Sequence, residues 1–244
     1  MDGRFEAAEH VRSSTGEEGT VLLDLRSGKY FALNAVGGLL WESMAAGASR
    51  SVLVQRLAER FPEVPADRLG HDADALLSQL LAKGLLRPRT GPGDEKEAPA
   101  PRPVFQPVWK DGSALEAATA SPFWVPIAFL ALLASDFILQ VLGFSRFHGL
   151  VRRIPTRPAA ASAARAQRIV RSVDRASAFY FKRAWCLQRS AVTAGLLRLS
   201  GLPARLVIGA RRVPFYAHAW VELDGRVVND RPAVRQEYEV LETC

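Results

Sequence analysis

The part of the sequence that most constrains the fold lies near the C-terminus, where one predicted helix precedes two predicted strands. Apolar residues recur there at the three-to-four spacing of one helical face, at Leu187, Ala191, Ala194 and Leu197. Gly201 and Pro203 follow and end the pattern, as such residues do beyond helix C-termini. Cys186 stands directly before the apolar pattern, so it falls in the first turn of the helix.

A cysteine in a first helical turn has altered chemistry. Unpaired backbone N–H groups and the positive end of the helix dipole favour a negative charge at that place. A thiol whose ordinary pKa is about 8.5 is therefore drawn towards the thiolate, the form that attacks carbonyl carbons. Cys186 is thus a candidate nucleophile. The competing interpretation is a small buried hydrophobe, which is the more common role of a lone cysteine.

Two strands follow the helix. Residues 204–209 and 216–223 have the composition of strands, and Asp224-Gly225 separates the second from a third run that begins at Arg226. Asp-Gly between two such runs is a strong signal for a tight antiparallel turn. The sequence therefore predicts a hairpin directly after the second strand.

The length of that turn decides which residues meet across the hairpin. If residues 223–225 form a three-residue bulged turn, His218 faces Asp230. A plain two-residue turn would instead set His218 opposite Arg231 and direct Asp230 to the other face of the sheet. We expect the bulged turn, because only that register brings the imidazole and the carboxylate together.

Nucleophile, base and orienting carboxylate are the parts of covalent acyl transfer. In this interpretation Cys186 attacks an amide carbon, His218 passes a proton to the leaving amine, and Asp230 holds the imidazole in one tautomer. Water then resolves the thioester, so the cut needs neither a metal nor an organic cofactor. The alternative is that His218 is an ordinary strand residue with a structural hydrogen bond.

These residues carry a resemblance to a known family. Cysteine at a helix start, AHAWVE on a strand and aspartate beyond a DG turn resemble the transglutaminase-like cysteine protease fold, which is papain-like and α+β. More narrowly, CLQRS followed by GLPARLVIGARRVPFYAHAWVELDGRVVND resembles the lasso peptide maturation proteases, the B proteins of those pathways. The resemblance implies a catalytic triad of Cys186, His218 and Asp230.

Residues 1–87 read as a separate small α+β domain. Val21–Leu25 and Lys29–Asn34 predict a hairpin, and residues 10–13 a short further strand. Three helices follow; the expected caps are Asn34, then Ser49 or Ser51, then Asp67, with the third helix ending at Lys83-Gly84. Strands followed by three helices give a winged-helix shape.

Winged helices often bind DNA, and a protein that binds double-stranded DNA needs a basic face. In this domain, however, acidic and basic residues nearly balance. We therefore expect no nucleic acid. The patterns SGKYFALNAVGGLLWE and ALLSQLLAKGLL resemble instead the PqqD-like precursor-recognition domains. The resemblance implies that a leader peptide adds a strand to the hairpin edge and packs on the third helix. The implied contact residues are Tyr30, Phe31, Ala32 and Leu33 on the strand, with Leu76 and Gln79 on the helix.

Residues 88–108 are rich in proline and predict a linker, so residues 109–244 form the catalytic domain. An apolar run at residues 124–144 nearly matches the length of a membrane span. Asp136 in its middle would be costly in hydrocarbon, so we expect a buried helix rather than membrane contact. The polar N-terminus shows no secretory signal, and two cysteines make no disulfide framework, which suits the reducing cytoplasm.

Residues 146–220 hold 15 Lys or Arg and one acid, Asp174. This charge can steer an acidic leader or partner towards Cys186, or it can be a set of solvated arginine-rich helices, and salt-dependent activity would distinguish the two. The sequence gives weaker signals for the groups that would donate hydrogen bonds to an oxyanion. The backbone N–H of Cys186 is the natural first candidate, with Gln167 or Gln188 as possible side-chain donors.

The resemblance in both domains implies a cysteine peptidase that removes the leader of a ribosomally made lasso precursor. The freed α-amine of the core would then be joined to a side-chain carboxyl by a separate, ATP-dependent, asparagine-synthetase-like cyclase. Two alternatives stay open. One is another thioester-forming acyltransferase in which an amine replaces water, and the other is an adaptor without enzymatic activity that binds and presents the precursor.

Overall fold

The computed structural model describes residues 4–89, 119–155, 163–181 and 185–244. The chain divides into two compact units, residues 1–102 and 103–244, and both mix helices with antiparallel strands, so the predicted α+β class is confirmed. Most of the predicted linker, residues 90–108, lies outside the described residues, and its limits stay a prediction.

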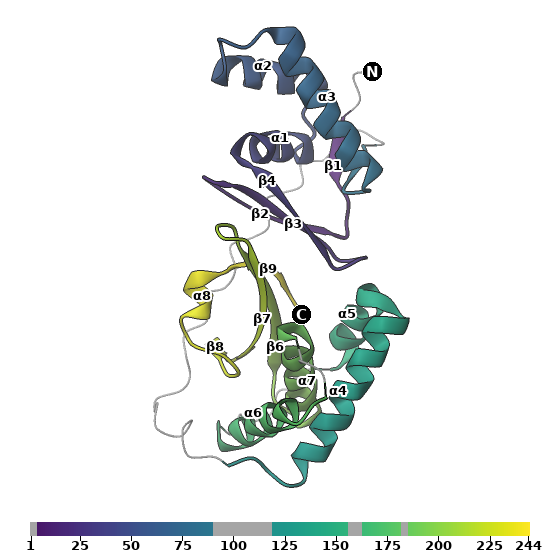
Figure 1. Ribbon diagram of the computed structural model, residues 1–244, viewed down its shortest axis with the longest axis vertical. Helices are drawn as coiled ribbons and strands as arrows, with labels where there is room; N and C mark the ends of the chain where they lie inside the picture. Colours follow the sequence, from purple (N-terminus) through teal and green to yellow (C-terminus); the bar gives the residue numbers. More distant parts are fainter. Residues whose placement is uncertain (1–3, 90–118, 156–162, 182–184) are drawn as a thin grey trace. The chain divides into compact units, whose positions relative to one another are not determined.

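The N-terminal unit contains two small sheets and three helices (Figure 1). The strands are β1 (Phe5–Ala7), β2 (Val11–Gly16), β3 (Gly19–Asp24), β4 (Lys29–Asn34) and β5 (Leu86–Pro88). The helices are α1 (Ala35–Ala45), α2 (Arg50–Arg60) and α3 (Ala66–Ala82). One antiparallel sheet has the order β2-β3-β4, and β1 pairs with β5. Strand β3 is buried along its whole length, whereas β4 lies at an edge of its sheet.

Local sequence signals account for most of this unit. The predicted hairpin is β3 and β4, and Asn34 caps α1 by accepting a hydrogen bond from the Gly37 N–H at 2.8 Å. Asp67 is not the cap of α3: that helix begins at Ala66 after Pro65, because proline is well tolerated at a helix start. The pairing of β1 with β5 was not predicted, since it joins short segments about eighty residues apart.

The C-terminal unit contains one four-stranded antiparallel sheet and a group of helices, most of which lie on one side of it (Figure 1). The helices are α4 (Trp124–Val141), α5 (Gly143–Arg153), α6 (Ala163–Ala178), α7 (Cys186–Leu199) and α8 (Val234–Glu237). The strands are β6 (Ala204–Arg211), β7 (Tyr216–Leu223), β8 (Arg226–Val227) and β9 (Glu239–Thr243), in the order β8-β7-β6-β9.

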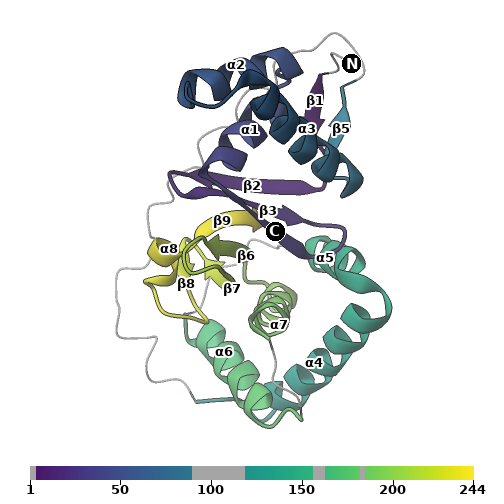
Figure 2. The same cartoon turned by 45° about the horizontal axis from the view of Figure 1, so that its top comes forward.

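Helix α7 is the centre of this unit. It packs on β6 and β7, while α4 and α6 lie against it from the side away from the sheet (Figure 2). Every residue from Ala191 to Arg198 is buried, so the helix is enclosed all round and the apolar face read from the sequence is only part of its contact surface. Arg198 is buried near its end and donates hydrogen bonds to the carbonyl oxygens of Ala204 and Val151, both at 2.7 Å.

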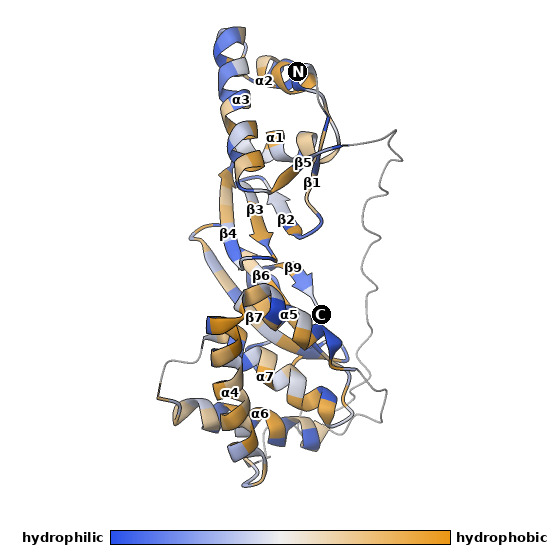
Figure 3. Cartoon of the chain, turned by 90° about the vertical axis from the view of Figure 1, so that its right-hand side faces the viewer, coloured by the Kyte–Doolittle hydropathy of each residue, from blue (hydrophilic) through white to orange (hydrophobic). Residues whose placement is uncertain are grey.

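Helix α4 differs from the buried helix expected at residues 124–144. The apolar run is broken at Leu142 and Gly143, where a positive φ of 78° begins α5. Within α4 only Ala128, Leu132 and Ser135 are fully buried, while Leu130 is 64% and Phe137 63% exposed. The helix is apolar along most of its length (Figure 3), so burial of one face does not use all of its hydrophobic surface.

Among the described residues, α4 is also the one helix whose length and apolar composition would allow it to cross a membrane. Its central acid, Asp136, has a structural role. One carboxylate oxygen accepts a hydrogen bond from Gln140 at 2.7 Å, and the other accepts one from Gln188 of α7 at 3.2 Å. Asp136 therefore ties α4 to the first turn of α7.

Candidate active site

Cys186 is the first residue of α7, as the sequence predicted. Trp185 precedes it in an extended conformation, and the Trp185 backbone N–H donates to the side-chain oxygen of Gln188 at 3.2 Å. Because the Gln188 amide also donates to Asp136, both ends of this side chain are engaged in holding the start of the helix. One of the two N–H groups of the Gln188 amide and its oxygen are therefore already engaged. Gln167 is buried on α6.

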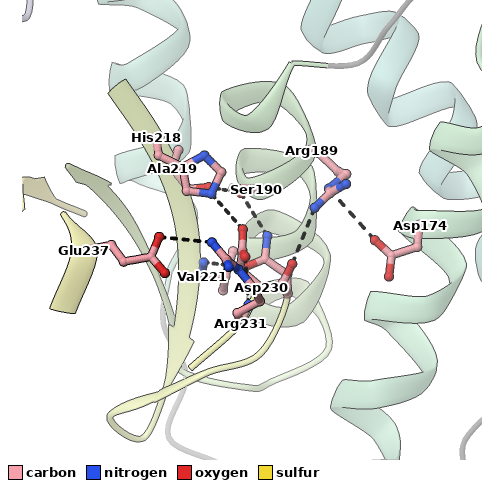
Figure 4. A network of polar contacts seen from close by, with 10 residues as sticks. Asp174, Arg189, Ser190, His218, Ala219, Val221, Asp230, Arg231 and Glu237 are labelled. Carbon is pink, nitrogen blue, oxygen red and sulfur yellow. Dashed lines mark hydrogen bonds and ion pairs between the residues drawn. The ribbon is translucent and has the colours of Figure 1, made fainter. Parts of the chain in front are cut away.

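His218 lies on β7, opposite Gly209 of β6. Its Nε2 is 2.7 Å from the carboxylate oxygen Oδ2 of Asp230, and Figure 4 shows the two side chains pointing towards each other. A side-chain hydrogen bond with Cys186 also contributes to the raised pKa of His218, so the thiol lies beside the ring; because Nε2 is engaged by Asp230, Nδ1 is the ring nitrogen left for the sulfur. The three predicted catalytic residues thus meet in one cluster, and the His218 and Asp230 side chains are 24% and 17% exposed.

The electrostatics of the cluster favour a thiolate and an imidazolium. Burial alone would raise the pKa of the Cys186 thiol, but hydrogen bonds from His218 and from the backbone at Ala219 and Leu187 outweigh it, and the pKa is lowered. The hydrogen bond with Cys186 raises the pKa of His218; burial opposes this rise, and Asp230 adds to it. The second cysteine, Cys244, behaves oppositely, because burial raises its pKa to about 11.

The predicted bulged turn is wrong. Leu223 pairs with Arg226, and Asp224 and Gly225 both have positive φ, so the turn is the two-residue type that Asp-Gly favours. Continued regularly, that register would direct Asp230 away from His218. It does not continue: β8 ends at Val227 and the chain bends before Asp230.

The Asp230 carboxylate is fixed at both oxygens. Oδ2 contacts His218, and Oδ1 accepts a hydrogen bond from the Arg231 backbone N–H at 2.7 Å. Arg231 in turn donates to Glu237 of α8 at 3.0 Å (Figure 4). Two further polar residues stand behind the cluster, Ser190 and Asn229, and both are buried. Neither was singled out from the sequence, because neither lies in a recognisable catalytic spacing.

Aromatic side chains surround the imidazole. The ring centroid of Tyr238 is 5.2 Å from that of His218, and the fully buried Trp220 is 6.4 Å away. Gly209 is required for this packing, since a Cβ at that position would lie 2.8 Å from the Trp220 ring and 2.8 Å from the Glu239 carbonyl oxygen. Trp185, beside the nucleophile, is 73% exposed and is available to contact a substrate.

The six residues predicted to bind a leader lie on two elements of the N-terminal unit. Tyr30, Phe31, Ala32 and Leu33 are on the edge strand β4, and Leu76 and Gln79 are on α3. Phe31, Leu33 and Leu76 are partly buried and pack against the same core cluster, whereas Gln79 is exposed. The Lys83 ammonium at the end of α3 lies 5.3 Å from the centre of the Phe31 ring.

No set of three or more His, Cys, Asp or Glu side chains suited to holding a metal ion occurs within the described ranges.

Family models match both units of the chain. Residues 129–243 match the transglutaminase-like superfamily, and residues 19–86 match coenzyme PQQ synthesis protein D, PqqD. The N-terminal unit is therefore PqqD-like and the C-terminal unit transglutaminase-like, as the sequence motifs suggested.

Similar proteins include the microcin J25-processing protein McjB of Escherichia coli, which is 43% identical over 56 residues. That match covers 23% of this chain and 27% of McjB, so it spans about a quarter of the relative. Two solved structures are similar over about a third of this chain and 99% of their own. One is TbiB1 in complex with the TbiA(beta) leader peptide (28% identity, TM-score 0.32), and the other is lasso peptide synthetase B1 complexed with the leader peptide (29%, 0.33).

Proposed function

We propose that this chain, which resembles the B proteins of lasso peptide biosynthesis in both of its units, is a cysteine peptidase that binds the leader of a lasso precursor and cuts it from the core. The observation that carries the proposal is the cluster in which a thiol at a helix start, an imidazole and a carboxylate are hydrogen-bonded in series. That arrangement suits acyl transfer through a thioester.

In the proposed reaction the Cys186 thiolate attacks the carbonyl carbon of the scissile amide. The C–N bond breaks as His218 gives its proton to the leaving amine, which departs as the α-amine of the core. Water then adds to the thioester, His218 accepts its proton, and the leader leaves as a carboxylic acid while the thiolate is restored. Asp230 stabilises the imidazolium and keeps its Nδ1 directed at the sulfur.

The tetrahedral intermediates need donors for a developing oxyanion. A backbone N–H at the first helical position has no partner within the helix, so we assign one donor to the N–H of Cys186.

Leader binding is proposed for the edge of β4. An edge strand presents unpaired backbone groups to which an extended peptide can add as a further strand. Side chains of the leader would then reach six residues of β4 and α3: Tyr30, Phe31, Ala32, Leu33, Leu76 and Gln79. Joining the recognition unit to the peptidase unit in one chain raises the effective concentration of the scissile bond near Cys186, so modest leader affinity would suffice.

The partners follow from the proposed product. A free α-amine on the core is the nucleophile for macrolactam formation, and this step would fall to a separate ATP-dependent, asparagine-synthetase-like cyclase. The cytoplasmic location expected from two free thiols stays a prediction.

The test is incubation of the purified chain with the precursor peptide encoded beside its gene, followed by mass spectrometry of the products. We expect two fragments whose masses sum to the precursor plus one water. An amine adduct of the leader would instead indicate the acyltransferase alternative.

The Cys186→Ala variant should bind the leader as well as the parent chain does and release no core. Cys244→Ala is the matched control, because it removes the other thiol without touching the cluster, and it should cleave normally. If precursor maturation in cells is instead intact with Cys186→Ala, the chain is an adaptor and the peptidase proposal fails.

A further inference from the structure

The register of the β7–β8 hairpin poses a geometric problem. With Leu223 paired to Arg226 and Glu222 to Val227, a regular ladder would continue with Val221 opposite Val228, Trp220 opposite Asn229 and Ala219 opposite Asp230. Side chains of directly paired residues share one face of a sheet, and successive residues alternate. Asp230 would then lie on the face of Ala219, opposite to that of His218, and the 2.7 Å contact could not form.

The ladder breaks at the pair formed by Val221 and Val228. In a regular hairpin of this type these two residues would exchange both backbone hydrogen bonds. One is present, from the Val228 N–H to the Val221 carbonyl at 3.0 Å. The Val221 N–H donates instead to the side-chain oxygen of Asn229 at 2.7 Å. The amide of Asn229 thus takes the place of a backbone carbonyl, and the chain leaves the sheet at this point.

The other end of the Asn229 amide binds the nucleophile's helix. Its Nδ2 donates to the Ser190 hydroxyl at 2.8 Å, and that hydroxyl donates to the Ala219 carbonyl at 2.8 Å. Ser190 lies one helical turn after Cys186, on the same face of α7. A single hydroxyl therefore links the helix of the thiol to the residue after His218 and to the residue before Asp230.

We propose that Asn229 and Ser190 are positioning residues of the Cys186, His218 and Asp230 cluster, which act by replacing a ladder hydrogen bond and so turning Asp230 back towards His218. Asn229 is 8% and Ser190 1% exposed, so both are shielded from competing water. The amide is fixed in one orientation, since its oxygen faces an N–H and its nitrogen faces a hydroxyl whose proton is used elsewhere.

Charged side chains also contact the bend that precedes Asp230. The Arg189 guanidinium reaches the Asn229 carbonyl at 3.5 Å and lies 3.9 Å from Asp174 of α6 (Figure 4). Burial raises the pKa of Asp174, and Arg189 opposes that rise. These contacts stabilise the bend from its outer side. The replacement of the ladder hydrogen bond at the Val221 N–H is made by the Asn229 side chain alone.

Asn229→Ala should restore the regular ladder. Without the amide, the Val221 N–H is free to bond the Val228 carbonyl, which extends β8 and carries Asp230 to the wrong face. His218 would then lose its carboxylate partner, its imidazolium would be less stable, and the thiol pKa of Cys186 would rise. The predicted signature is an electrostatic change at the sulfur rather than a simple loss of folded protein.

The experiment measures the rate at which iodoacetamide alkylates Cys186 as a function of pH, in full-length chains that carry Cys244→Ala. Cys186 is then the only cysteine, because the sequence holds two. We expect Asn229→Ala to move the midpoint upward, as Asp230→Asn does, with the rate below the midpoint falling about tenfold for each unit of pKa. Ser190→Ala removes only a hydroxyl and should move the midpoint in the same direction by less.

A double variant makes the test specific. If Asn229 acts through Asp230, the Asn229→Ala and Asp230→Asn changes together should give the midpoint of Asp230→Asn alone. Ser172→Ala is the matched control: this buried hydroxyl accepts the Ser121 N–H at 3.0 Å, away from the cluster, and its loss should leave the midpoint unchanged.

An unshifted midpoint in folded Asn229→Ala or Ser190→Ala, or additive shifts in the double variant, would overturn the inference. The inference rests on the proposed function for its biological meaning, but alkylation needs no substrate. Failure of the parent chain to cut a precursor would therefore refute the peptidase and leave the positioning role to be judged by the alkylation profiles.

Discussion

Replacement of Asp230 by Asn isolates the electrostatic role of the carboxylate. Asparagine keeps the shape of the side chain and can still accept the Arg231 N–H, but it removes the charge 2.7 Å from the His218 imidazole. Both side chains of the pair are less than one quarter exposed, so solvent screens the interaction only partly. The hydrogen bond with Asp230 raises the pKa of His218, and its loss should lower that pKa.

The magnitude follows from the type of interaction. A hydrogen bond to a charged partner contributes about 1.5–3 kcal/mol. Because about 1.4 kcal/mol corresponds to one pKa unit, Asp230→Asn should lower the pKa of His218 by about one to two units. A lower imidazolium pKa means that His218 loses its proton at lower pH, and with it the ability to protonate the leaving amine.

The assay is kcat/KM for precursor cleavage across pH. We expect the alkaline limb to move about one to two pH units downward in Asp230→Asn, with activity near neutral pH reduced about tenfold to a hundredfold. KM should change little, because Asp230 lies behind the imidazole. An unchanged alkaline limb, with or without a fall in kcat, would refute the argument that Asp230 acts by stabilising the imidazolium.

Three further predictions concern the scaffold. Gly209→Ala should lower both the melting temperature and kcat, because the new methyl group would press on Trp220 and a backbone carbonyl. The control is Gly149→Ala on α5, where nothing lies within 4 Å, and it should be neutral or stabilising by up to about 1 kcal/mol. Thermal unfolding of the two variants in parallel compares them. Arg198→Met should lower the free energy of unfolding in urea by about 2–4 kcal/mol, since the carbonyl groups of Ala204 and Val151 each lose a buried charged donor. Asn34→Ala should cost about 1 kcal/mol through loss of the α1 cap, and Asn34→Asp should largely restore stability in the same assay.

Local signals were sufficient for a large part of the fold and for the choice of the candidate catalytic residues. The helix that begins at Cys186, the hairpin of β3 and β4, and the Asn34 cap each depend on residues within a few positions of one another. Such short-range features can be predicted from the sequence, because backbone sterics and side-chain periodicity act between residues only a few positions apart. The same signals placed His218 on a strand and Asp230 beyond it.

The features that the sequence did not predict depend on contacts between residues far apart in the chain. The exposed face of α4 reflects how much surface α6 and α7 can cover, and a run of apolar residues does not report its neighbours. Strand β1 needs β5, which lies at the other end of its unit, before it can form.

The order and types of the residues identify the candidate catalytic groups, since a cysteine at a helix start and a histidine on a strand can be recognised from the sequence alone. Their meeting is a property of the folded chain. The turn that local sequence favours would have kept Asp230 from His218, and the contact exists because the Asn229 amide bonds to Val221 and to Ser190, thirty-nine residues earlier. Contacts over that distance form only when the helix and the sheet pack together, so tertiary structure decided the geometry of the site.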